Sequence, residues 1–241
     1  MRRVFGIFFV ALALVACDEA DSKPKAAAET EDHAGHDHVA TETAAPLSEA
    51  ALKLLQPEAA PADVQPYTWT ERTLGSESAP VTMVEYASLG CGHCAHFHKK
   101  NLPIIKKKYV DTGKVRFVFR DFPLNAVAFQ AAQLSRCVPE VTYFAAVGML
   151  FEKQNDWHKA EGSEEALRQI LSVAGLDKAA VDACLASAPL KEKLLEVRLR
   201  AANELGVQST PTLFINGVKV EGDISPEALT ARLDALLPAQ P

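Results

Sequence analysis

The sequence predicts an α/β fold that consists of a strand-helix-strand unit, a long helical insertion, a hairpin and a final helix. Apolar runs of strand length occur at 81–87 and 115–119, with a helical pattern between them. Strand signals are absent from about 124 to 205 and resume at 212–220. Because a helix connects the first two strands, we expect them to lie parallel in one sheet.

The first strand and the helix after it have clear limits. Val81–Ala87 is largely apolar, which is typical of a strand buried on both faces. The helical pattern runs from Cys91 to about Val110 and ends at Asp111-Thr112-Gly113, and Pro103 should kink it. The second strand follows at Val115–Phe119. The apolar side of the helix is expected at Phe97, Leu102, Ile105 and Tyr109.

The last part of the chain has strong turn and cap signals. Asn216-Gly217 lies between the apolar runs Thr212–Ile215 and Val218–Val220, and this pattern predicts a hairpin. Gly206 is suited to ending the helix before it, and Ser225-Pro226 to starting the final helix. Apolar residues fall on one face of these two helices: Leu194, Val197, Ala201 and Leu205, then Leu229, Leu233 and Leu237. The order of elements indicates a thioredoxin-like fold with an inserted helical domain at about 124–205.

Composition and charge exclude several classes of protein. The chain has 241 residues, of which 48% are hydrophobic, and a net charge of -6, so it is neither wholly disordered nor a multi-pass membrane protein. Residues 18–64 hold eleven acids and three lysines, whereas residues 65–241 hold twenty charges of each sign. A charge-balanced domain therefore follows an acidic segment, and no basic surface indicates nucleic acid as a partner.

The first residues have the pattern of an export signal. Arg2 and Arg3 precede the apolar run Val4–Ala16, which is shorter than the roughly 20 residues that span a bilayer. Leu14-Val15-Ala16-Cys17 resembles a bacterial lipobox, so we expect a signal peptide at 1–17 and acylation of Cys17, with an ordinary signal and an incidental cysteine as the alternative. Asp18 resembles an inner-membrane retention signal. The expected location is the periplasmic side of the inner membrane, or the periplasm if Cys17 is not acylated.

Residues 18–65 predict a flexible acidic tether ahead of a folded domain at 66–238. The segment is rich in Ala, Glu, Asp, Thr and Pro and has too few large apolar residues to offset the entropy of ordering. One weak helix, Leu47 to Leu55, can interrupt it. Three histidines of the tether could bind zinc or copper weakly, but a flexible loop gives them no fixed geometry, so a solvated tether is favoured: His33, His36 and His38.

Cys91-Gly92-His93-Cys94 lies where the first strand passes into the helix, and it predicts a redox centre. The first thiol is then at a helix N-terminus, where free N–H groups and the helix dipole favour thiolate. His93, if protonated or donating a hydrogen bond, is expected to favour the Cys91 thiolate as well. The two sulfurs fall within one helical turn and can close a disulfide. We therefore expect Cys91 to be the exposed nucleophile and Cys94 the buried resolving thiol.

Other uses of this motif fit the sequence less well. A c-type haem site requires Cys-x-x-Cys-His, but position 95 is alanine. A zinc site requires a second pair of ligands, and His96 and His98 lie further along the same helix, where four ligands do not easily converge. A purely structural disulfide would be an unusual use of a strand-to-helix turn. We expect no bound metal and no other cofactor.

Two segments together resemble the DsbA-like family of periplasmic thiol:disulfide oxidoreductases over about residues 66 to 238. They are Glu85 to Cys94, EYASLGCGHC, and Gly206 to Gly217, GVQSTPTLFING. The resemblance implies that Pro211 is cis and faces the cysteines, where the Thr210 backbone can pair with a substrate strand. It also implies that Glu85 is a buried acid that relays the proton of Cys94. The alternative is that Glu85 reaches water at a strand edge.

Cys137 and Cys184 lie in the helical insertion and belong to no local motif. If Cys17 is acylated and Cys91 pairs with Cys94, these two cysteines remain, and we expect them to form a structural disulfide. Some bacterial relatives have a second, non-catalytic disulfide in this domain. Two buried free thiols are the alternative.

The resemblance implies a membrane-tethered oxidase that introduces disulfides into exported, cysteine-containing proteins and is reoxidised by a membrane partner of the DsbB type. An isomerase or reductase is the alternative, because Thr210 stands where the best-known oxidases have valine and because Gly-His is the dipeptide of eukaryotic isomerases. Against an isomerase, the bacterial ones dimerise through an ordered N-terminal domain, which the tether does not resemble. We expect a monomer. A third hypothesis is a copper-handling module that uses Cys91, Cys94 and the tether histidines.

Overall fold

The computed structural model describes residues 47–56, 67, 69–158 and 161–238. The expected signal peptide, Cys17 and the three tether histidines lie outside the described residues. Within the described part, no helix is both long enough and apolar enough to cross a membrane.

Five strands form one mixed sheet in the order β1-β3-β2-β4-β5. The central strands β2 and β3 are parallel, as the helix between them predicted, and the other three pairs are antiparallel. The predicted α/β fold class and the parallel pairing of the first two predicted strands are therefore confirmed. The strands are β1 (Arg72–Leu74), β2 (Val81–Ala87), β3 (Val115–Asp121), β4 (Thr212–Ile215) and β5 (Val218–Lys219).

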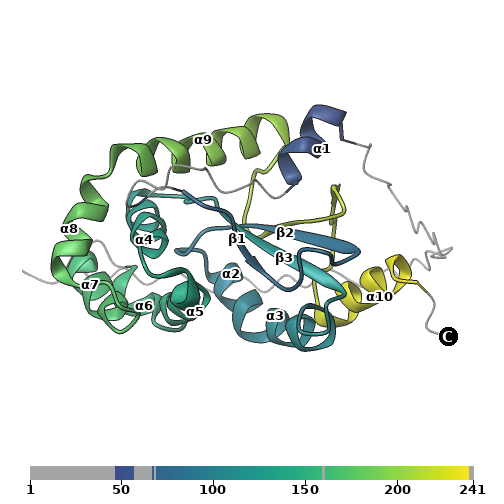
Figure 1. The fold of residues 1–241 in the computed structure, drawn as a ribbon, viewed down its shortest axis with the longest axis horizontal. Coiled ribbons are helices and arrows are strands. Elements are labelled where there is room, and N and C mark those ends of the chain that lie inside the picture. The colour runs from purple at the N-terminus through teal and green to yellow at the C-terminus, as the bar shows by residue number, and fades with distance from the viewer. Residues whose placement is uncertain (1–46, 57–66, 68, 159–160, 239–241) are drawn as a thin grey trace, which may run out of the picture. The chain divides into compact units, whose positions relative to one another are not determined.

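Helices cover both faces of the sheet (Figure 1). α1 and α9 lie on one side, and α2, α3 and α10 lie on the other. The helices from α4 to α9 form the insertion between β3 and β4, which matches the predicted range. Outside the segments between β2 and β3, the helices are α1 (Glu49–Leu55), α4 (Ala126–Arg136), η3 (Glu140–Thr142), α5 (Tyr143–Glu152), α6 (Gln154–Trp157), α7 (Ser163–Ser172), α8 (Lys178–Ala186), α9 (Ala188–Glu204) and α10 (Pro226–Leu236).

The helical stretch between β2 and β3 is divided into α-helical and π-helical segments. They are α2 (Gly92–His96), η1 (Phe97–Asn101), α3 (Leu102–Ile105) and η2 (Lys106–Val110), of which η1 and η2 are π-helical. η1 ends just before Pro103, the residue predicted to disturb the helix. Proline has no N–H for the bond to the carbonyl four residues earlier, which favours a wider turn at this point. The four apolar residues of the predicted inner side are all buried.

The register between β2 and β3 decides which side chains share a face. Glu85 pairs with Phe119, and Tyr86 pairs with Arg120. Because side chains alternate along a strand, Glu85 and Phe119 point to one face and Tyr86 and Arg120 to the other. The first face is the one that contacts η1, since Glu85 is bonded to His98.

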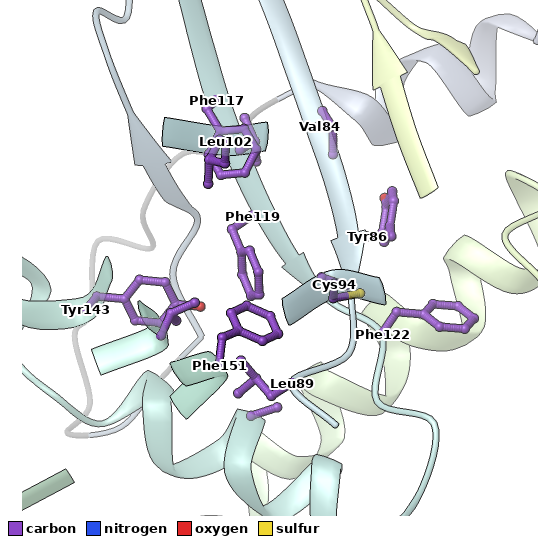
Figure 2. Close-up of a cluster of buried hydrophobic side chains, with 14 of the residues drawn as sticks. Val84, Tyr86, Leu89, Cys94, Leu102, Phe117, Phe119, Phe122, Tyr143 and Phe151 are labelled. Atoms are coloured by element: carbon purple, nitrogen blue, oxygen red, sulfur yellow. The ribbon is translucent and has the colours of Figure 1, made fainter. Parts of the chain in front are cut away.

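A hydrophobic cluster joins the sheet to the helices on both faces. Figure 2 draws Cys94 within this cluster, together with Phe119 of β3, Phe151 of α5 and Leu89. These four side chains are almost completely inaccessible to solvent. The second cysteine of the Cys-x-x-Cys is thus a member of the core, whereas the first is half-buried at its border.

The N-terminal part of the fold differs from the prediction. We expected the folded domain to begin near residue 66, with 47–55 as a weak helix in a flexible tether. In the structure, α1 packs on the sheet with Ala51 and Leu55 buried, and β1 adds an antiparallel edge strand next to β3. No strand was predicted at β1, because it is only three residues long and begins with an arginine.

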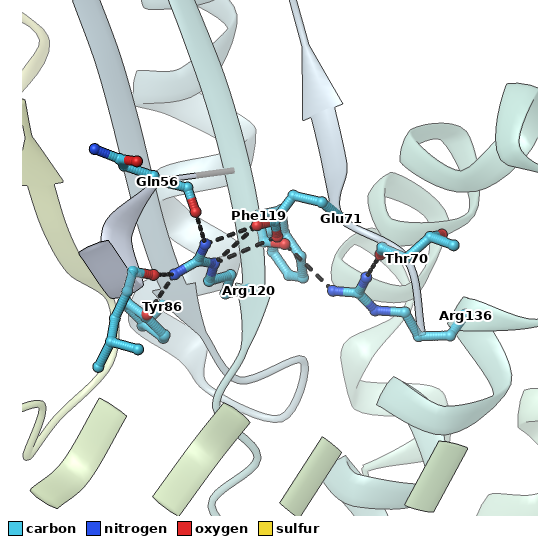
Figure 3. Close-up of polar contacts among 8 residues, drawn as sticks. Gln56, Thr70, Glu71, Tyr86, Phe119, Arg120 and Arg136 are labelled. Atoms are coloured by element: carbon cyan, nitrogen blue, oxygen red, sulfur yellow. Dashed lines mark hydrogen bonds and ion pairs between the residues drawn. The ribbon is translucent and has the colours of Figure 1, made fainter. Parts of the chain in front are cut away.

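Arg120 explains why α1 is part of the fold. Its guanidinium donates to the carbonyl oxygens of Leu54 and Gln56 at the end of α1, and it also contacts the hydroxyl of Tyr86 (Figure 3). Its charge is balanced by Glu71, with 2.7 Å between the nearest N and O atoms. Since the last carbonyls of a helix have no partner within it, a buried cation there caps α1 and fixes it to the sheet.

The last helix of the insertion and the elements after it agree with the predictions. The apolar face of α9 is buried at Leu194, Val197 and Ala201, the C-cap residue Leu205 is also buried, and Gly206 follows with a positive φ of 64°. Asn216 and Gly217 have φ angles of 47° and 83°, as a tight hairpin turn requires. The side-chain oxygen of Ser225 accepts from the N–H of Ala228 and caps α10.

A disulfide joins two helices of the insertion. Cys137 at the end of α4 is bonded to Cys184 in α8, with 6.1 Å between their Cα atoms. Next to it, the side-chain amide of Gln133 donates to the carbonyl oxygen of Cys184 at 2.6 Å. The two contacts fix α8 against α4 across a sequence separation of 47 residues.

Replacing both cysteines by alanine is expected to lower the free energy of unfolding by about 2–4 kcal/mol, because the unfolded chain regains the freedom that this long loop closure removes. Denaturant unfolding of the variant and the wild type, both with Cys91 and Cys94 oxidised, measures the difference. Equal midpoints and slopes would show that the cross-link does not stabilise the domain.

Candidate active site

The loop after β2 places Cys91 at the start of a helix. The N–H of Cys91 donates to the carbonyl oxygen of Ser88 at 3.0 Å, which turns the chain away from the strand. Cys91 is the N-cap residue of α2 and has extended backbone angles. Because the first N–H groups of a helix have no partner within it, the sulfur of Cys91 lies near unsatisfied donors.

These surroundings lower the pKa of the Cys91 thiol from 9.0 to about 5. The main cause is a hydrogen bond from the thiol of Cys94, which stabilises the Cys91 thiolate. Thr210 and the backbone N–H groups of Cys94 and His93 act in the same direction, and partial burial opposes them. His93 therefore acts on the sulfur through its backbone, while its side chain is exposed to solvent.

Thr210 is opposite Cys91 on the loop that precedes β4. The thiol of Cys91 donates to the carbonyl oxygen of Thr210 at 3.2 Å, and the bond between Thr210 and Pro211 is cis. A thiolate has no proton to donate, so this hydrogen bond exists only for the neutral thiol. The hydroxyl of Thr210 is buried and has no hydrogen-bond partner among the described residues, so it can donate to the sulfur once Cys91 is ionised.

The surroundings of Cys94 raise the pKa of its thiol, whereas those of Cys91 lower it. The Cys94 side chain has no solvent exposure, and burial raises the pKa of its thiol far above the usual range. The hydrogen bond with Cys91 and the negative charge of Glu85 raise the pKa further. The reduced pair therefore consists of a thiolate at Cys91 and a thiol at Cys94.

Glu85 lies on the central strand β2 and has no solvent exposure, so it does not reach water at a strand edge. One carboxylate oxygen is 2.7 Å from Nε2 of His98 in η1. The other oxygen has no hydrogen-bond partner within the part of the chain that the structure describes. A buried carboxyl with one free oxygen next to a buried thiol can accept or donate a proton.

The helical insertion also contacts the active-site loop. The side-chain amide of Gln154 in α6 donates to the carbonyl oxygens of Leu89 at 2.6 Å and Cys91 at 3.1 Å. One turn later, His158 packs against Gly90, where an added Cβ would be 2.6 Å from Nε2 of the histidine. The insertion therefore holds the backbone of the loop on which the nucleophile lies.

Two residues of this site were not predicted for these roles. His98 was considered only as a zinc ligand, and its spacing of four residues from Cys94 was the available signal that both lie on one helix face. Gln154 had no sequence signal, because its contacts depend on how the insertion folds back. Among the described residues, no group of three or more histidines, cysteines, aspartates or glutamates is arranged to hold a metal ion.

Comparison with known proteins places this site in a family. Residues 68–235 match the family model described as "Thioredoxin". The crystal structure of α-DsbA1 from Wolbachia pipientis is similar with a TM-score of 0.68 and 32% identity, over 77% of this chain and 95% of that one.

Curated relatives point in the same direction. A protein of Rickettsia felis named "Putative protein-disulfide oxidoreductase" is 31% identical over 70% of this chain, and one of Rickettsia typhi is 32% identical over 63%. The matched regions span 61% and 56% of those two relatives. A "Probable disulfide bond formation protein D" of Bacillus anthracis is 28% identical over 61% of this chain and 70% of its own length. These names and the site geometry together support a disulfide-exchange function.

In the reduced protein, the Cys91 thiol is expected to titrate with a pKa of about 5, well below its ordinary value of 9.0. The ultraviolet absorbance of the thiolate, recorded against pH, measures this transition, and the Cys91→Ala variant should lack it. A transition near pH 9 in the wild type would contradict the assignment.

The same shift predicts a pH dependence of stability. A lowered pKa in the folded state stabilises the reduced protein fully above pH 9.0, and this contribution is lost as the pH falls toward 5. Relative to the oxidised protein, the free energy of unfolding of the reduced protein should therefore decrease over that range. Denaturant unfolding of both forms at each pH tests the sign.

Proposed function

Because this chain belongs to the thioredoxin family and to its DsbA-like members, we propose that it is a thiol:disulfide oxidoreductase that introduces disulfides into exported proteins. The observation that supports this most directly is the asymmetry of the pair: a Cys91 thiol with a lowered pKa and a buried Cys94 thiol. Stabilising the reduced, thiolate form makes the corresponding disulfide a better oxidant.

The proposed reaction begins with the Cys91–Cys94 disulfide. A substrate thiolate attacks Sγ of Cys91, which is half-buried and accessible, whereas Cys94 is not. The S–S bond breaks, its electron pair passes to Sγ of Cys94, and a mixed disulfide forms between Cys91 and the substrate. A second thiolate of the substrate then attacks the substrate sulfur of the mixed disulfide. The substrate leaves with a new disulfide, Cys91 leaves as a thiolate, and two electrons have passed to the enzyme.

We assign the remaining roles from the surroundings of the two sulfurs. The stabilised Cys91 thiolate is the better leaving group in the second step. Glu85 supplies the proton that Cys94 takes up and accepts it again on reoxidation. His93 contributes to the thiolate through its position at the start of α2. The backbone of Thr210, which reaches the sulfur of Cys91, is the proposed docking point for an extended substrate segment.

The proposed location of the protein rests on the sequence of residues outside the described part. The apolar run ending at Cys17 supports export and acylation, which would tether the domain to the periplasmic side of the inner membrane. A membrane partner of the DsbB type would then remove the two electrons. Exported proteins with pairs of cysteines are the proposed substrates, and we propose that the chain acts as a monomer.

The reduction potential of the Cys91–Cys94 pair tests the direction of the reaction. We expect a value nearer to about -120 mV than to about -270 mV after equilibration with glutathione. A variant in which Cys137 and Cys184 are alanine ensures that only the active-site disulfide is counted. A potential near that of thioredoxin would exclude the oxidase and favour a reductase or isomerase, which the threonine at position 210 also permits.

Replacing Cys17 by alanine tests the tether. The variant is expected to move from the membrane fraction to the soluble fraction and to change its mobility on a gel, because it can no longer be acylated. Cys91→Ala is the matched control, since it removes a cysteine without affecting the lipobox. Unchanged fractionation and mobility of Cys17→Ala would exclude the lipoprotein.

A further inference from the structure

Among the described residues, the carboxyl group of Glu85 has one hydrogen-bond partner through which it can exchange a proton with solvent. Its side chain has 0% solvent exposure, and its bonded oxygen is 2.7 Å from Nε2 of His98. The His98 side chain keeps 7% of its surface exposed. Of the two partners, only the imidazole reaches solvent.

An aromatic cage fixes the ring of His98. Its centroid is 4.4 Å from that of Phe151 in α5 and 5.5 Å from that of Phe119 in β3. Phe117 of β3 and Phe97, the preceding residue in η1, complete the cage at 6.4 Å and 5.8 Å. Four phenyl rings make no hydrogen bonds with the imidazole, so the cage orients the ring and leaves its nitrogens for Glu85 and for proton exchange.

The ionisable groups around His98 are few. Glu85 faces it from β2, while β3 and α5 present the phenylalanines of the cage. Glu152, which follows Phe151 in α5, is 3.8 Å from Nζ of Lys99 instead. Cys94 lies on the same helical stretch, four residues before His98. The charge of Glu85 raises the pKa of the Cys94 thiol. The three groups are therefore coupled in the order Cys94, Glu85, His98.

We propose that His98 is the positioning residue that holds Glu85 toward Cys94 and passes its proton to and from solvent. This inference depends on the thiol–disulfide exchange proposed above and adds the path of the proton. When the Cys91–Cys94 bond breaks, Cys94 receives an electron pair and needs one proton. Glu85 donates it through the oxygen that has no other partner, and the carboxylate regains a proton from solvent by way of the imidazole. On reoxidation, the proton leaves along the same path. An imidazole suits this task because one nitrogen can accept a proton while the other donates one.

The test compares His98→Gln with wild type. Glutamine can still donate a hydrogen bond to Glu85, but it cannot accept and pass on a proton. His96→Gln is the matched control, because His96 is exposed on the same helical stretch two residues away. The measured quantity is the rate at which reduced glutathione opens the Cys91–Cys94 disulfide over a series of pH values, with quenching by alkylation.

The ratio of the wild-type rate to the His98→Gln rate is expected to change with pH and to reach at least about tenfold, since a positioned proton donor contributes about 10² to 10⁴-fold. His96→Gln should give a ratio near one at every pH. A ratio for His98→Gln that is the same at all pH values would overturn the proposal, since a structural role alone gives that result.

A double-mutant cycle tests whether His98 acts through Glu85. In the Glu85→Gln background, His98→Gln should cause no further change in the pH profile, because the proton path is already interrupted. A full additional effect would contradict coupling between the two residues.

A measurement on wild-type protein is independent of any variant that fails to fold. Nuclear magnetic resonance of labelled histidine and glutamate should show that the protonation of the pair His98 and Glu85 differs between the oxidised and reduced forms at the same pH. Identical protonation in both forms would overturn the proposal. Failure of the proposed function is distinguishable, because the disulfide would then not react with glutathione in any variant.

Discussion

The burial of Cys94 is the constraint on which the rest of the site depends. Desolvation, the hydrogen bond with Cys91 and the charge of Glu85 all oppose ionisation of its thiol. The same hydrogen bond stabilises a thiolate on Cys91, which lies at the N-terminus of α2. Opening the Cys91–Cys94 disulfide must therefore bring a proton to a sulfur without contact to water, and closing it must remove that proton. A buried acid on the central strand meets this requirement, and such an acid is stable only if the fold gives it a partner.

The sequence predicted the parts of this arrangement that depend on local order along the chain. A strand followed by Cys-x-x-Cys at a helix start, the Asn216-Gly217 hairpin and the apolar faces of α9 and α10 each need only a short window of residues. The parallel pairing of β2 and β3 followed from the helix between them. The resemblance to DsbA-like proteins, which the comparisons confirm, rested on two such windows.

What the sequence did not predict depends on contacts between distant segments. α1 was interpreted as a weak helix in a tether, because the residue that caps it, Arg120, comes 65 positions after its last residue Leu55. Gln154 had no recognisable pattern, since its role depends on the insertion folding back over the active-site loop. His98 was visible as a residue one turn after Cys94, but its partner on β2 could be identified only from the register of the sheet.

The buried acid Glu85 and the buried cation of Arg120 lie on opposite faces of the central strands. Glu85 and its neighbour Tyr86 point to opposite sides of β2, and their partners Phe119 and Arg120 do the same on β3. On the face that holds α1, Arg120 is paired with Glu71, and its guanidinium donates to a carbonyl oxygen at the end of that helix. Glu85 remains on the face of the redox pair, where the ionisable residue bonded to it is a histidine. A lysine or arginine bonded to Glu85 in place of His98 would keep its charge throughout, whereas an imidazole can release its proton. The alternation of side chains along β2 and β3 thus places the ion pair that holds α1 on the face opposite the acid of the redox site.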